Sequence, residues 1–136
     1  MSGSPSRPPG RGALLLVIGL GGVLGALGRW GVDVAWGERA PGAWPWATFV
    51  VNVIGCLAIG VLAARLPSDH GPWWPRPFLI TGILGGFTTF SAYALETGAL
   101  LTEGATIAAI AYLAGTVVVG LLAVRIGVLI ARGGAA

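Results

Sequence analysis

Long uncharged segments alternate with short polar ones along this chain. Four such runs can be counted, over residues 12–28, 43–64, 77–95 and 104–124. Each is close to the roughly 20 residues that cross a hydrocarbon core of about 30 Å. With their polar flanks, the runs predict helices over about 13–36, 43–65, 76–100 and 104–131. The pattern therefore predicts an all-α fold, with a single four-helix transmembrane domain over residues 12–132.

The remaining composition supports this class. Residues 1–11 consist mostly of Ser, Pro, Gly and Arg, which predicts a disordered N-terminal tail. The whole chain of 136 residues is 55% hydrophobic and only 10% charged, fewer charges than a soluble domain carries. Four spans leave no room for a separate soluble domain. We therefore interpret the net charge of +3 as a matter of membrane orientation and site chemistry rather than of nucleic-acid binding.

The arginines are unevenly distributed over the connections. With four spans, both termini and the second connection lie on one side, which collects six of the eight basic residues: Arg7, Arg11, Arg65, Arg76, Arg125 and Arg132. Only Arg29 and Arg39 fall on the other side. The positive-inside rule then predicts a multi-pass protein of a bacterial-type plasma membrane with cytoplasmic termini.

The third run contains the most unusual stretch, residues 82–93. Three glycines and four hydroxyl-bearing side chains occur there, where a membrane helix ordinarily carries Leu, Ile and Val. Such residues weaken a helix, and a helix that opens in lipid is tolerated only where protein or water satisfies its backbone. The stretch predicts a break around residues 85–89. The alternative is that Gly82, Gly85 and Gly86 only let another helix approach closely, and the stretch alone does not decide between the two.

Other polar residues fall inside or at the ends of the runs. Thr48 and Asn52 are four residues apart, so they share a face of the second helix. Tyr112 and Thr116 share a face of the fourth. The side-chain amide of an Asn in a membrane helix commonly forms a hydrogen bond to another helix. This is the alternative interpretation for Asn52. Arg29 either snorkels to the headgroups or faces an aqueous pocket.

Catalytic chemistry is not indicated. His70 stands alone in a predicted loop, Cys56 is the single cysteine and is predicted to pack between helices, and no paired carboxylates occur within the runs. These residues offer neither a catalytic constellation nor a set of ligands for a structural metal such as zinc. We therefore predict that the chain is not an enzyme and binds no organic cofactor.

Three motifs together carry a resemblance to a known family. They are the Gly-Gly-Phe-Thr-Thr-Phe-Ser segment at 85–91, the glycine run that leads to Arg29, and the Thr48-x-x-x-Asn52-x-x-Gly55 run. With these in a four-span chain, the sequence resembles the CrcB/Fluc fluoride channels. The resemblance covers nearly the whole chain beyond the tail. It implies an antiparallel dimer of the dual-topology type, with the helix breaks meeting at the centre and two fluoride pathways at the interface.

The resemblance also implies roles for individual residues. A structural sodium ion would be held by the backbone carbonyls of Gly85 and Thr88. The fluoride pathway would be lined by the polar and aromatic residues Asn52, Phe90, Ser91, Tyr93, Tyr112 and Thr116. Arg29, Thr48 and Glu96 would lie toward the vestibules. Tyr93 departs from the family pattern, which has phenylalanine at that position; tyrosine keeps the electropositive ring edge and adds a hydroxyl.

The chemistry of these side chains agrees with a fluoride pathway. Fluoride is small and tightly hydrated, so a pore must replace its water with hydrogen-bond donors, which amides and hydroxyls supply. The edges of aromatic rings are weakly positive and can touch an anion without trapping it. The resulting expectation is passive, fluoride-selective export from the cytoplasm, with fluoride and the lipid bilayer as partners.

The arginine bias bears on assembly, because a subunit that inserts both ways should have balanced charges. The pair is therefore either an antiparallel homodimer or a heterodimer with an oppositely inserted homologue. Two other functions remain as alternatives. A small proton-coupled exporter of organic cations needs a carboxylate inside the membrane, and Glu96 lies near a boundary. A non-transporting assembly subunit would leave the break and Asn52 unexplained.

Overall fold

The computed structural model describes residues 10–66 and 71–133, and this part of the chain is helical without any strand. Most of the predicted tail and His70 lie outside the described residues. The elements are α1 (Arg11–Trp36), α2 (Trp46–Arg65), η1 (Pro77–Leu84), α3 (Gly85–Phe87), α4 (Phe90–Thr102) and α5 (Thr106–Gly133). The first helix thus begins at Arg11, a residue that the sequence assigned to the tail.

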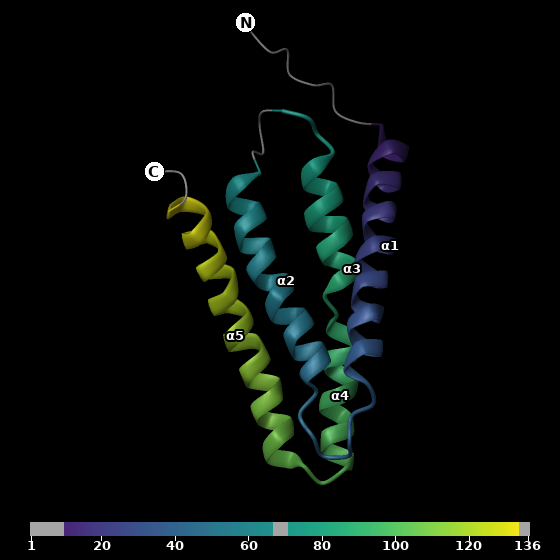
Figure 1. Ribbon diagram of the computed structural model, residues 1–136, viewed down its shortest axis with the longest axis vertical. Coiled ribbons are helices and arrows are strands. Elements are labelled where there is room, and N and C mark those ends of the chain that lie inside the picture. Colours follow the sequence, from purple (N-terminus) through teal and green to yellow (C-terminus); the bar gives the residue numbers. More distant parts are fainter. Residues whose placement is uncertain (1–9, 67–70, 134–136) are drawn as a thin grey trace, which may run out of the picture.

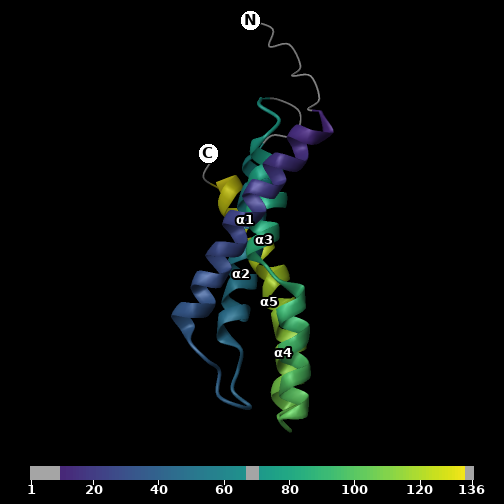
Figure 2. The ribbon, with the colours of Figure 1, turned by 90° about the vertical axis from the view of Figure 1, so that its right-hand side faces the viewer.

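Four apolar helices are long enough to cross a membrane, and the third of them, Pro77–Thr102, is built from η1, α3 and α4. The predicted four-span fold with an interrupted third helix is therefore confirmed. Figure 1 shows the start of α1 and the end of α5 at one end of the bundle, with the connections 37–45 and 103–105 at the other. Turned by 90°, the bundle shows α1 and α4 diverging toward that second end (Figure 2).

Glycines bring α1 and the first half of the third span into close contact. Gly21 and Gly25 of α1 are buried against η1 and α3. A Cβ atom on Gly82 would lie 2.8 Å from the carbonyl oxygen of Ile18 and 2.9 Å from the Cα of Gly21. Because these neighbours are backbone atoms, only glycine permits this approach. The eight residues of η1 are wound as a π-helix, a rare form that is frequently found at functional sites.

A second glycine seam joins α2 to α5, through Gly60, Gly120 and Gly127. Side chains on these glycines would meet the backbone of the facing helix or, at Gly120, the sulfur of Cys56 at 3.3 Å. Cys56 is half-buried and forms no disulfide bond. Its position between α2 and α5 agrees with the prediction that it packs between helices.

The core of the bundle lies between α4 and α5. It consists of Tyr93, Leu100, Ala109 and Tyr112, with Trp44 and Phe49 packed against it. Aromatic side chains bury large areas and favour edge contacts, as between Trp44 and Tyr112, whose ring centroids are 5.4 Å apart at 90°. This core fixes α4 against α5 beside the helix break.

The two connections at the loop end are clasped together. Arg39 binds Glu103 through two parallel hydrogen bonds of 2.9 and 3.0 Å, and the backbone N–H of Gly42 donates to the same carboxylate at 2.7 Å. The guanidinium of Arg39, followed by the Gly42 N–H, lowers the pKa of Glu103 below its ordinary value. The turn that carries Glu103 is closed by Gly104 at φ +78°, a conformation that favours glycine.

Candidate functional site

The third span opens at two threonines. Thr88 and Thr89 are both extended, between the end of α3 and the start of α4. The Thr88 hydroxyl and N–H both donate to the Leu84 carbonyl, at 2.8 and 2.9 Å. The Thr89 hydroxyl caps α4 by accepting from the N–H of Ala92 at 3.1 Å. The glycines and the threonines thus have separate roles, since Gly82 packs on α1 and the break follows six residues later.

Asn52 of α2 satisfies the backbone at the break. Its Nδ2 donates to the carbonyl of Thr89 at 3.0 Å, and its Oδ1 accepts from the N–H of Thr89 at 2.8 Å. The side-chain amide thereby replaces both hydrogen bonds that Thr89 loses outside a helix, which lets the chain open inside lipid. An NH₂ group has two donors, so one N–H of Asn52 is not used by Thr89.

The break also leaves two carbonyls without their helical donors. In a continuous helix, the N–H of Thr89 would bond to the carbonyl of Gly85, and that of Ala92 to the carbonyl of Thr88. Here the first N–H donates to Asn52 and the second to the Thr89 hydroxyl. Gly85 and Thr88 are the two residues whose carbonyls would hold a sodium ion according to the family resemblance, which remains a prediction.

A pocket of about 340 Å³ lies beside the break, between α2, α4 and α5. Five of the residues that were singled out in the sequence line it together: Asn52, Thr88, Phe90, Tyr93 and Thr116. Phe90 is 79% exposed, whereas Thr116 is 8% exposed and its buried hydroxyl has no hydrogen-bond partner in the described part of the chain. The pocket therefore combines an exposed ring with an unused hydroxyl donor.

The two aromatic residues of the pocket behave differently. Their ring centroids are 5.7 Å apart, but the Tyr93 ring is 7% exposed and also contacts Tyr112 at 5.4 Å. The Tyr93 hydroxyl donates to the carbonyl of Leu113 on α5 at 2.6 Å. The ring of Tyr93 thus lines the pocket while its hydroxyl is held by a neighbouring helix.

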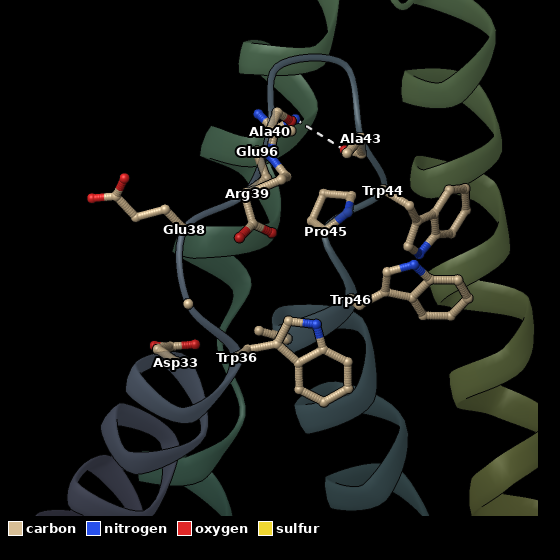
Figure 3. Close-up of a pocket in the computed structure, with 12 residues that line it drawn as sticks. Asp33, Trp36, Glu38, Arg39, Ala40, Ala43, Trp44, Pro45, Trp46 and Glu96 are labelled. Atoms are coloured by element: carbon tan, nitrogen blue, oxygen red, sulfur yellow. Dashed lines mark hydrogen bonds between the residues drawn. The ribbon is translucent and has the colours of Figure 1, made fainter.

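A second polar cluster joins three helices around Glu96. Its two carboxylate oxygens accept from the hydroxyls of Thr48 at 2.8 Å and Tyr112 at 2.7 Å. Glu96 also lines a pocket of about 390 Å³ beneath the first connection. Figure 3 shows Trp44 and Trp46 on one side of this pocket and Asp33 and Glu38 on the other. The lining is therefore acidic and aromatic, and its one guanidinium, Arg39, is already paired with Glu103.

Five of the predicted residues line neither pocket: Arg29, Thr48, Gly85, Ser91 and Tyr112. Arg29 reaches across from α1 to the carbonyl of Gly86, with Nε 3.4 Å from the oxygen. It thus lies near the break rather than beside Thr48 and Glu96, with which it was grouped. Ser91 is exposed, and its hydroxyl is 3.2 Å from that of Thr89.

Sequence reasoning did not single out three residues that build the site. Thr89 receives Asn52 and caps α4, a role that its hydroxyl, three residues before Ala92, could have indicated. Trp44 packs its ring on Tyr112, and its buried indole N–H has no partner in the described residues. Leu113 acts through its backbone carbonyl, for which an apolar sequence gives no signal.

These features define a class: a multi-pass membrane protein of the channel or transporter type, with a helix opened at mid-span and polar groups of three helices gathered beside it. The particular family follows from comparison. A family model described as "CrcB-like protein, Camphor Resistance (CrcB)" matches residues 16–128, and the chain belongs to this family.

Relatives are similar along almost their whole length. A protein of Nocardia farcinica named fluoride-specific ion channel FluC 2 is 50% identical over 134 residues, which cover 95% of this chain and 93% of the relative. Proteins named fluoride-specific ion channel FluC are 48% identical in Paracoccus denitrificans and 44% identical in Chloroflexus aurantiacus. Each of these two alignments covers 87% of this chain and 94% of the relative.

Proposed function

We propose that this chain is a subunit of a fluoride-selective channel that exports fluoride passively from the cytoplasm. The observation that carries the proposal is the opened third span, which Asn52 holds beside a pocket of donors and rings. Membership of the CrcB-like family supports the same conclusion, as do the fluoride-channel names of relatives that are 44–50% identical over 87–95% of this chain.

The pocket at the break supplies what a dehydrated anion needs. Asn52 has an N–H that Thr89 does not use, and the Thr116 hydroxyl is buried without a partner. The edges of the Phe90 and Tyr93 rings add weakly positive, apolar contacts. Several weak contacts of this kind allow an ion to leave as well as to enter. In this proposal the Tyr93 hydroxyl is not a fluoride donor, because it is committed to Leu113.

The Glu96 cluster would form the approach to this pocket from the loop end. Thr48 and Tyr112 give their hydroxyls to the carboxylate and so fix α2, α4 and α5 relative to one another. Ser91, which is exposed near the start of α4, would add a further hydroxyl to the pathway. Arg29 would attract anions toward the break while it braces the Gly86 carbonyl.

A sodium ion at the break is part of the proposal. The carbonyls of Gly85 and Thr88 have lost their helical donors, and hard cations such as sodium prefer oxygen ligands. These two residues would hold the ion. A bound sodium would supply a fixed positive charge at the centre of the assembly.

The channel would be a pair, because the pocket at the break is open and Phe90 is largely exposed on its rim. The antiparallel arrangement of the pair is the one that the resemblance to the fluoride channels implies. In the described part of the chain, the end with the termini carries five arginines and no carboxylate. The connections at the opposite end carry Glu38, Arg39 and Glu103, and the half of the bundle that leads to them carries Arg29, Asp33 and Glu96. By this bias the termini would be preferentially cytoplasmic. The second member is then either an inverted copy or an inverted homologue.

Fluoride efflux from liposomes that contain only the purified chain tests the function. We expect rapid fluoride efflux with little chloride efflux, and its loss in Phe90→Ala. Leu95→Ala, a change at another exposed position of α4, is the matched control and should conduct like the wild type. If neither ion moves, the chain should be co-reconstituted with its inverted homologue. If that pair also shows no fluoride efflux, the channel function is refuted. Robust fluoride efflux from the single chain would refute an obligatory partner.

One observation favours the exporter as a second candidate. Glu96 is half-buried within α4 rather than at its end, and it lines a pocket with three tryptophans and two further carboxylates. Aromatic and acidic linings are suited to organic cations. An exporter predicts ethidium transport driven by a pH gradient in the same liposomes, abolished by Glu96→Gln. The channel predicts no such transport by the wild type.

A further inference from the structure

The arginines of the described chain fall into two groups. Arg29, Arg39 and Arg76 each donate to a protein acceptor, which for Arg76 is the carbonyl of Leu66 at 3.0 Å. The remaining four make no hydrogen bond or ion pair within the described residues, and all are exposed at the end with the termini: Arg11, Arg65, Arg125 and Arg132. These exposed guanidiniums are free to bind an anionic group at the membrane surface.

Two of these unpaired arginines share one face of α5. Arg125 and Arg132 are seven residues apart, about two helical turns, so their side chains lie above one another. The buried residues of this part of α5, Ala123, Gly127 and Ala131, point toward the rest of the bundle. Leu129 lies between the two arginines on the outer face and is 56% exposed. The pair thus frames an apolar surface that is open to lipid.

The depth of the pair matches that of a phospholipid headgroup. The uncharged run 104–124 spans about 30 Å as a helix, the thickness of the hydrocarbon core, so Arg125 lies at its boundary. Arg132 lies about 10 Å further along the axis. Because the headgroup layer adds only about 5–8 Å on each side, a phospholipid phosphate would lie at a depth between the two guanidiniums. Helical side chains lean toward the N-terminus, so Arg132 leans toward that phosphate, and Arg125 reaches it by snorkelling.

We propose that Arg125 and Arg132 form a binding site for an anionic phospholipid, whose phosphate they share and whose acyl chains lie along the outer face of α5. Among the described residues, no carboxylate lies at this end of the bundle to pair with either guanidinium. Neither arginine lines the pocket at the break, so this site is independent of the proposed ion pathway.

Native mass spectrometry of the purified full-length chain tests the site. The protein is incubated with equal amounts of phosphatidylglycerol and phosphatidylcholine that have identical acyl chains. We expect the wild type to retain phosphatidylglycerol preferentially, and Arg125→Gln and Arg132→Gln each to lower that preference about fivefold, the ratio expected for one guanidinium at a lipid surface. Arg76→Gln is the matched control. It removes an arginine from the same end, but one that is already bonded to Leu66.

Several results would overturn the site. Equal retention of the two lipids by the wild type would do so, as would an equal loss in Arg76→Gln, which would indicate only general surface charge. Displacement of the bound lipid by excess inorganic phosphate would show recognition of phosphate without the lipid. Unchanged retention in both glutamine variants, with loss of dimer, would assign the arginines to subunit contact. If Arg125→Gln is not recovered, Arg132→Gln at the helix end decides the question.

Discussion

The N-terminal half of the third span, η1 with α3, lies against α1, whereas the C-terminal half, α4, lies against α5 and α2. The first half is attached by backbone contacts across Gly21, Gly25, Gly82 and Gly86. The second half is attached mainly by hydrogen bonds from polar side chains on one face of α4 and by the aromatic core. The two halves of one span are thus held by different interactions.

The difference follows from what each half must do. The glycine contacts bring the backbone of η1, a π-helix, close to that of α1, and they use no polar side chain. Hydrogen bonds at Thr89, Tyr93 and Glu96 hold α4 in one orientation while leaving the pocket at the break open. A helix held by side-chain bonds can present donors and rings to a pathway, which a helix packed backbone to backbone cannot.

Removing the amide that joins the halves should have the largest effect. Asn52→Ala leaves the N–H and the carbonyl of Thr89 unpaired in lipid, at a cost of about 1–3 kcal/mol each. We expect fluoride efflux to fall at least about tenfold, because destabilising the open form of the break by about 1.4 kcal/mol lowers its population by that factor. Cys56→Ala, on the same helix and lining the same pocket, should leave efflux unchanged. Wild-type efflux from Asn52→Ala would show that the break does not depend on this amide.

The second-largest effect should come from a larger side chain at the glycine contacts between η1 and α1. In Gly82→Ala, the new Cβ would press on the backbone of Ile18 and Gly21. We expect a loss of about 1–3 kcal/mol in the free energy of unfolding, the usual cost of overpacking, measured by titration with denaturing detergent.

The matched control is Gly98→Ala in α4, where a Cβ would meet nothing within 4 Å. It should be neutral or stabilising by about 0.4–1 kcal/mol, because alanine restricts the unfolded chain. Equal destabilisation by the two changes would contradict the claim that only the first half depends on its glycines.

Tyr93→Phe should have a smaller effect on the α4 side. The ring and its contacts with Phe90 and Tyr112 remain, and only the bond to the Leu113 carbonyl is lost. Hydrogen bonds between membrane helices average about 0.6 kcal/mol, so the melting temperature should fall slightly while fluoride efflux persists. Abolished efflux with an unchanged melting temperature would instead make the hydroxyl a fluoride donor. The melting temperature and efflux of Tyr93→Phe should be compared with those of Tyr112→Phe, which removes the hydroxyl that donates to Glu96.

Much of this arrangement could be predicted from the sequence, because it rests on local patterns. The four spans follow from run lengths, and the break follows from glycines and hydroxyls in residues 82–93. The separate roles of Gly82, which packs on α1, and Thr88, which lies at the break, could not be predicted, because they depend on which residues contact α1. The pairing of Asn52 with the backbone of Thr89 joins residues 37 positions apart, and no local pattern specifies such a contact. The same holds for Arg39 and Glu103, which are 64 positions apart.

The smallest effect concerns this last pair, which pins the end of α4 to the first connection. Because Arg39 and the Gly42 N–H lower the pKa of Glu103, the clasp stabilises the fold above the ordinary carboxyl pKa. The stabilisation is lost as the pH falls through the lowered value. The melting temperature of the wild type should therefore exceed that of Glu103→Gln by a small, constant amount near neutral pH, and the two should converge in acid. A difference that persists in acid would show that the clasp does not depend on the charge of Glu103. The end of α4 would then be held, like η1 against α1, by contacts that do not depend on charge.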